Sequence, residues 1–208
     1  IKNSTGTGAF QNGFLFYNIQ NLIGTAGNDT LGGAAGGNSS LTGGTGADAL
    51  TGYGLNNTAS YAGAAAVTVN LSGTSVGGIA GHSGKGGDAE GDTYTGIQNV
   101  TGGNGNDLFI ASGDTNIFNG GGGTSNTVSY AGSSAGVVAS LNTAAGSTGD
   151  ATGDTFITIQ NLTGTDFVDK LTGLTAGGSV LTGGAGADQL IGLGYNSANA
   201  TTTSNTAN

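Results

Sequence analysis

The chain has 208 residues, of which 46 are glycine, and it contains no Pro, Cys, Met or Trp. Three lysines against twelve acidic residues give a net charge of −9, which excludes the basic surface that nucleic acids and anionic membranes attract. The absence of cysteine excludes disulfides and thiolate metal sites, and no apolar run is long enough for a membrane span.

Residues 1–18 form the first predicted segment and are distinguished by clustered aromatic side chains, at Phe10, Phe14, Phe16 and Tyr17. One interpretation is a hydrophobic cap over the coil that follows. The other is a contact segment, because the open end of a sheet exposes unpaired backbone that can pair with another chain. Self-association through the ends is therefore the predicted partnership, and no small-molecule substrate is expected.

Residues 19–195 repeat themselves at two scales. The tripeptide Ile-Gln-Asn starts long units at Ile19, Ile97 and Ile159, and the first unit exceeds the second mainly by insertions near 49–56 and 72–86. Within the units, apolar residues recur every 19 positions, in the pairs Leu22 and Leu41, Leu31 and Leu50, Phe109 and Val128, Leu162 and Leu181, and Leu171 and Leu190. A glycine-rich helix has no reason to keep this period, whereas a solenoid stacks one coil per period. We predict an all-β fold, a right-handed parallel β-solenoid of the β-roll type, with roughly eleven coils of about 19 residues.

Glycine-rich runs separate these apolar positions and indicate tight turns, because glycine adopts positive φ at little cost. Acidic residues follow the same 19-residue step, in the series Asp29 and Asp48, then Asp88 and Asp107, then Asp150, Asp169 and Asp188. Stacked carboxylates repel one another, so such columns oppose folding unless a cation binds between them.

Residues 196–208 form the last predicted segment. They are rich in Thr and Asn and lack the apolar 19-residue step, so they offer no regular inward-facing residues to extend a core. We predict a polar tail or linker.

One motif carries the chemistry of the turns. The nonapeptide Gly-Gly-x-Gly-x-Asp-x-U-x, where U is a large apolar residue, occurs without departure at 43–51, 102–110 and 183–191. Copies at 24–32 and 164–172 depart at one and two positions. With the spacer phrases between the copies, this pattern resembles the hemolysin-type calcium-binding repeat (RTX) family of secreted bacterial proteins.

The resemblance implies Ca²⁺ held between neighbouring turns by carboxylates and backbone carbonyls, the oxygen ligands that this cation takes. The metal residues that it implies are Asp29, Asp48, Asp88, Asp107, Asp150, Asp169 and Asp188. Its best pairs are Asp29 with Asp48, Asp88 with Asp107, Asp150 with Asp169, and Asp169 with Asp188. Asp92 and Asp154 are further candidates, for which a structural role in a turn is the competing interpretation.

The expected function is that of a non-catalytic, calcium-stabilised structural module of a secreted bacterial surface protein, in a surface layer, adhesin or filament. No enzyme is expected, because the acidic pairs are periodic and the single histidine, His82, lies in a Gly/Ser-rich loop. Two alternatives stay open. One is a C-terminal export and folding module of a type I-secreted hydrolase, which the resemblance suggests; the other is an ice- or glycan-binding adhesin segment.

Overall fold

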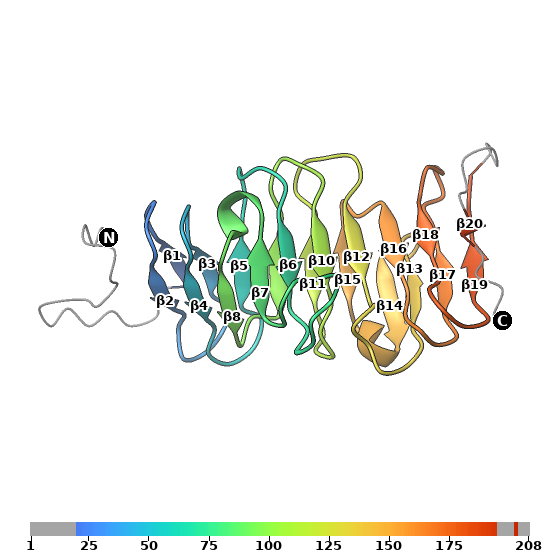
Figure 1. The fold of residues 1–208 in the computed structure, drawn as a ribbon, viewed down its shortest axis with the longest axis horizontal. Coiled ribbons are helices and arrows are strands. Elements are labelled where there is room, and N and C mark those ends of the chain that lie inside the picture. The colour runs from blue at the N-terminus through green and yellow to red at the C-terminus, as the bar shows by residue number, and fades with distance from the viewer. Residues whose placement is uncertain (1–19, 195–201, 204–208) are drawn as a thin grey trace, which may run out of the picture.

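The computed structural model describes residues 20–194 and 202–203. Phe10, Phe14, Phe16 and Tyr17 lie outside the described residues, so a cap or contact segment there stays a prediction. The described residues form two sheets of ten strands each, and no α-helix occurs among them. Figure 1 shows the strands stacked side by side along one long axis. The predicted all-β solenoid is confirmed, and its strands are mostly parallel, with antiparallel pairs as the departure from the predicted parallel arrangement.

Sheet A contains ten strands, whose spatial order is β1 (Asn21–Ile23), β3 (Ser40–Thr42), β5 (Thr58–Ser60), β9 (Asn99–Thr101), β11 (Ile117–Asn119), β15 (Thr155–Ile157), β14 (Ala145–Thr148), β13 (Val138–Ser140), β17 (Lys170–Thr172) and β19 (Gln189–Ile191). Sheet B contains β2 (Thr30–Gly32), β4 (Ala49–Thr51), β8 (Thr93–Thr95), β7 (Ser83–Lys85), β6 (Thr68–Asn70), β10 (Leu108–Ile110), β12 (Thr127–Ser129), β16 (Asn161–Thr163), β18 (Leu181–Thr182) and β20 (Thr202–Thr203). Two 3₁₀-helices, η1 (Gly87–Ala89) and η2 (Gly149–Ala151), complete the described elements. Thus β20 extends sheet B from within the segment predicted to be a tail.

The 19-residue step is the register between neighbouring coils. Leu22 pairs with Leu41 and Leu31 with Leu50, and the other three predicted apolar pairs are also in register. In β4 the middle residue, Leu50, is buried between two half-buried neighbours. A strand this short needs only one inward apolar side chain, so a chain with few large apolar residues still builds a continuous core.

Two meanders interrupt this period, one in each sheet. In the first meander, β6 pairs with β10, β8 pairs with β4, and antiparallel β7 fills the space between them. In the second meander, β13 pairs with β17, β15 pairs with β11, and antiparallel β14 lies between. In both, the chain moves ahead along the sheet, turns back and then fills the positions it had passed.

The two meanders lie in different sheets because the first long unit contains an additional half coil. The insertion near 49–56 supplies β4 and the turn that follows it, which is one passage from one sheet to the other. The first meander consequently lies in sheet B and the second in sheet A. No helix among the described residues has the length and apolar character needed to cross a membrane.

Candidate functional site

Side-chain oxygens along both edges of the solenoid form ladders of hydrogen bonds between coils. Asp48 Oδ1 accepts the Asp29 backbone N–H at 2.7 Å, and Asp92 Oδ1 accepts the Asp48 backbone N–H at 2.8 Å. Asp188 Oδ1 accepts the Asp169 backbone N–H at 3.0 Å. Carboxamide oxygens make the same bond in other coils, from Asn57, Gln98, Asn126 and Gln160. Each rung satisfies a backbone N–H that a tight turn would otherwise bury unpaired.

The acidic residues of the nonapeptides are divided between the two edges. Asp29, Asp48 and Asp107 lie in turns that lead from sheet A to sheet B. Asp169 and Asp188 lie in turns that lead from sheet B to sheet A, on the opposite edge. The edge changes because the second long unit lacks the additional half coil of the first, so the chain makes an odd number of passages between the sheets within it and starts the third unit in sheet B.

Two of the four predicted pairs are wrong as neighbours. Asp88 lies in η1, and Asp107 instead bonds Val67 on one side and Asn126 on the other, at 2.8 and 2.9 Å. Asp150 lies in η2, and the Asp169 carboxylate accepts the Val137 backbone N–H at 2.7 Å. The 19-residue step fails at these places because Asp88 and Asp150 lie within the meanders, where the chain leaves the coil-by-coil path.

The pairs Asp29–Asp48 and Asp169–Asp188 are confirmed as neighbours, and oxygen atoms of successive turns gather at both. A Cβ on Gly24 would stand 2.2 Å from Gly43 O and 2.7 Å from Asp29 Oδ2. A Cβ on Gly164 would stand 2.5 Å from Gly183 O and 2.3 Å from Asp169 Oδ2. In each case glycine opens space in which a carbonyl of one turn approaches the carboxylate of the turn before.

Asp48 contains the only buried side-chain oxygen or nitrogen among the described residues that lacks a hydrogen-bond partner, namely Oδ2. The residue is 1% exposed, and its Oδ2 lies against the backbone of Gly43, where a Cβ would be 2.0 Å away. An unsatisfied buried carboxylate oxygen is costly, so a donor or a cation at this point would be favourable.

Two asparagines that make the equivalent ladder bond in other turns show which contacts such a turn offers to the side chain. The Asn57 amide nitrogen donates to the carbonyls of Tyr53, Gly54 and Gly96, at 3.1 to 3.3 Å. The Asn126 amide nitrogen likewise donates to three carbonyls, those of Gly120, Gly122 and Thr158. The turn thus offers a cluster of carbonyl oxygens to its ladder residue. A carboxylate has no N–H to donate to such a cluster, whereas a cation bound between them satisfies both.

Burial and mutual repulsion perturb the acidic residues of the ladder. The pKa of Asp48 is raised to about 6, chiefly by burial, with smaller contributions from the charges of Asp92, Asp29 and Asp88, and against the lowering effect of the Asp29 N–H. Burial also raises the pKa of Asp107, which the N–H groups of Val67 and Gly103 partly offset. A bound divalent cation would act in the opposite direction and keep these carboxyls ionised.

Asp92 and Asp154 belong to a different arrangement, in which a tyrosine hydroxyl donates a hydrogen bond to the second carboxylate oxygen. Tyr61 Oη donates to Asp92 Oδ2 at 2.7 Å, and Tyr130 Oη donates to Asp154 Oδ2 at 2.7 Å. Both carboxylates are fully buried, and both accept a backbone N–H on the other oxygen. The structure therefore gives each a protein partner on both oxygens. Sequence reasoning missed the tyrosines, although the repeated phrase Ser-Tyr-Ala-Gly marked their positions.

Replacing Tyr130 with Phe is expected to destabilise the protein by about 1–3 kcal/mol, since it leaves Asp154 Oδ2 buried without a donor. The Tyr130 hydrogen bond lowers the pKa of Asp154, so the Asp154 carboxyl should titrate at a higher pH in the variant. Urea unfolding measures the first effect. Tyr53→Phe is the matched control, because Tyr53 is half exposed, and equal losses in the two variants would contradict the assigned role.

The candidate site is therefore two acidic pairs on opposite edges, each beside backbone carbonyls. Within the described part of the chain, no three or more His, Cys, Asp or Glu side chains are grouped as a metal site, so a cation at either pair would depend largely on carbonyl ligands. Comparison with protein-family models, curated proteins and solved structures finds no match to this chain.

Proposed function

We propose that this chain is a calcium-stabilised structural module of a secreted surface protein, without a catalytic role. The observation that carries the proposal is the unsatisfied Oδ2 of Asp48, buried at a turn whose asparagine counterparts gather three carbonyls each. Calcium accepts mixed carboxylate and carbonyl ligands in flexible geometries, which suits such a turn better than the strict octahedron of Mg²⁺.

Asp29, Asp48, Asp169 and Asp188 would hold the cation, one pair on each edge. When bound, calcium supplies positive charge between turns that otherwise stack carboxylate on carbonyl. The residues of the chain position these oxygens by the ladder bonds, in which Asp48 Oδ1 and Asp188 Oδ1 each accept a backbone N–H of the preceding coil. Because the pairs form only in the folded solenoid, binding would stabilise the fold itself.

An extracellular location is part of this proposal. Millimolar calcium outside the cell fills weak sites that stay empty in a low-calcium cytosol. The resemblance to the RTX repeats supports the same location, and the absence of cysteine is compatible with export and later folding. Self-association through the ends stays a prediction, because the aromatic segment lies outside the described residues.

Calcium is expected to raise the free energy of unfolding by about 2.7 kcal/mol at a concentration one hundred times the Kd. Thermal unfolding followed by circular dichroism, in EDTA and in rising Ca²⁺, measures the effect, with Mg²⁺ as the comparison ion. A calcium titration that leaves the unfolding temperature unchanged would contradict the proposal.

The Asp48→Asn variant tests the placement of the site. An asparagine keeps the Oδ1 bond to Asp29 and brings a donor for the carbonyls, as Asn57 and Asn126 already do. We expect this variant to be at least as stable as the parent in EDTA and to gain less from calcium. Asp114→Asn is the control, since Asp114 is exposed and lies outside the ladder. An unchanged calcium response in Asp48→Asn would remove Asp48 from the site.

A further inference from the structure

A cavity of about 260 Å³ opens where the second insertion of the first unit returns to the solenoid. Three segments surround it: the loop after β6, the turn after β8 and the turn after β10. Its floor consists of Leu71, Tyr94 and Ile97, which are apolar or aromatic and buried. His82 and Asp114 also line it, and both side chains are exposed. The cavity therefore combines an apolar base with polar groups at its opening.

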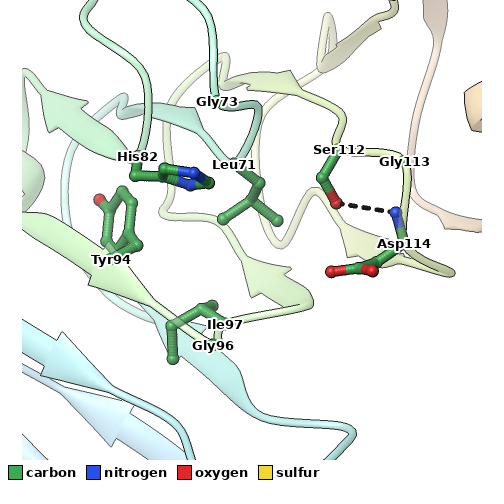
Figure 2. Close-up of a pocket in the computed structure, with 9 residues that line it drawn as sticks. All are labelled: Leu71, Gly73, His82, Tyr94, Gly96, Ile97, Ser112, Gly113 and Asp114. Carbon is green, nitrogen blue, oxygen red and sulfur yellow. Dashed lines mark hydrogen bonds between the residues drawn. The ribbon is translucent and has the colours of Figure 1, made fainter.

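Backbone hydrogen bonds hold the two residues, His82 and Asp114, that carry these polar side chains. His82 donates its N–H to Ser72 O at 2.9 Å and accepts the Tyr94 N–H at 3.0 Å, which leaves its ring for the cavity. The Asp114 N–H donates to Ser112 Oγ at 3.3 Å. Figure 2 shows His82 and Tyr94 to one side of Leu71, and Ser112 and Asp114 to the other. A ligand on Leu71 would thus meet an imidazole and a carboxylate from opposite sides.

The second meander shows that the fold does not need this histidine. Ala144 has the equivalent position, with a φ of +54° against +52° for His82. Its carbonyl accepts the Phe156 N–H, as that of His82 accepts the Tyr94 N–H. At this place in the second meander, the side chains of Thr175 and Asn142 hydrogen-bond to each other. The left-handed backbone conformation is common to both meanders, whereas the imidazole and the longer loop belong to the first meander alone.

We propose that this cavity binds one neutral saccharide residue. A sugar ring presents C–H groups that suit the apolar floor, and hydroxyls that suit the carboxylate and the imidazole. The net charge of −9 disfavours an acidic sugar, and the volume lies just below the range of about 300–1,000 Å³ for larger ligands. The proposal concerns binding without turnover, and it is independent of the calcium sites. It departs from the sequence-based expectation that the chain takes no small molecule, and gives the glycan-binding alternative a location.

The single histidine makes the test direct, because the imidazole signals in a proton–nitrogen NMR spectrum can only come from His82. We expect glucose, galactose, mannose or N-acetylglucosamine, titrated one at a time, to move these signals with a Kd of about 1–10 mM. Saturation-transfer difference spectra, observed on the sugar, report binding to variants that lack the histidine. His82→Ala should abolish this transfer while keeping the unfolding temperature, as Ala144 predicts. Asp114→Asn should weaken binding about fivefold or more.

Asp166→Asn is the control and should bind the sugar unchanged, because Asp166 is exposed and does not line the cavity. Failure of all four sugars to move the His82 signals would overturn the proposal, and so would binding that survives both His82→Ala and Asp114→Asn. Saturable movement of the signals by Ca²⁺ or Zn²⁺, with no response to sugar, would assign a cation site and would equally overturn it. None of these outcomes depends on whether calcium stabilises the solenoid.

Discussion

Lowering the pH from about 8 to about 5 is expected to stabilise the protein in EDTA, contrary to the usual effect of acid. Burial raises the pKa of Asp154 to about 7 and that of Asp48 to about 6, from an ordinary value of 3.8. The folded state therefore binds more protons than the unfolded state between about pH 4 and pH 7. Stability is highest below the ordinary pKa and is lost as the pH rises through the raised values, by on the order of 3 kcal/mol.

Urea unfolding in EDTA at pH 5 and pH 8 measures this difference. Asp154→Asn should reduce it, because an asparagine can accept the Asn116 N–H and donate to Tyr130 Oη without titrating. With calcium present the trend should reverse, since protons would then compete with the cation for Asp48. A steady loss of stability on acidification in EDTA would show that these carboxyls are ionised in the fold at pH 5.

Replacing Phe109 with Ala is expected to lower the free energy of unfolding by about 3–5 kcal/mol. Phe109 is fully buried in sheet B and stacks on Phe118 of sheet A, with 5.8 Å between ring centroids and an interplanar angle of 11°. Val69 and Val128 flank it in register. Each coil contributes few large side chains, so its neighbours cannot fill the space that a missing phenyl ring leaves.

Phe167→Ala is the matched control for this prediction. Its side chain is 47% exposed in a turn, so the change should cost within about 0.5 kcal/mol. Equilibrium urea unfolding compares the two variants through the midpoint concentration at constant slope. Similar losses for both would mean that the aromatic stack does not anchor the centre of the solenoid.

The fold could be predicted from the sequence wherever coils follow one another directly. Leu31 and Leu50 are 19 residues apart and pair in one sheet, because equal chain lengths between equal turns bring the same residues into register. The antiparallel strands could not be predicted in this way. β7, with the sequence Ser-Gly-Lys, has no large apolar residue and no counterpart at the 19-residue step, so nothing in its pattern distinguishes it from a loop.

The candidate site, like the fold, could be predicted only where coils follow one another directly. Asp29 and Asp48 belong to adjacent coils without an intervening meander, and the spacing placed them correctly. Asp88 and Asp107 have the same spacing, but Asp88 lies in η1 within the first meander, so Val67 occupies the place expected for Asp88. Asp92 is a candidate from its repeated phrase, whereas Tyr61 lies in another repeated phrase, Ser-Tyr-Ala-Gly, and is not a candidate. Their contact depends on how the first meander turns back, which no local pattern records.

The meanders also set the order in which the chain can fold. In a plain solenoid, each coil can add to the one made before it. In this chain β6 lies beside β10, and the positions next to β4 are filled only when β7 and β8 return. If folding starts at the N-terminal coil, the chain must leave a gap in sheet B and later a second gap in sheet A. Each gap closes only when the returning strands fill it. Growth from one end is interrupted twice, and non-local closure of these gaps is the step expected to limit the rate of folding.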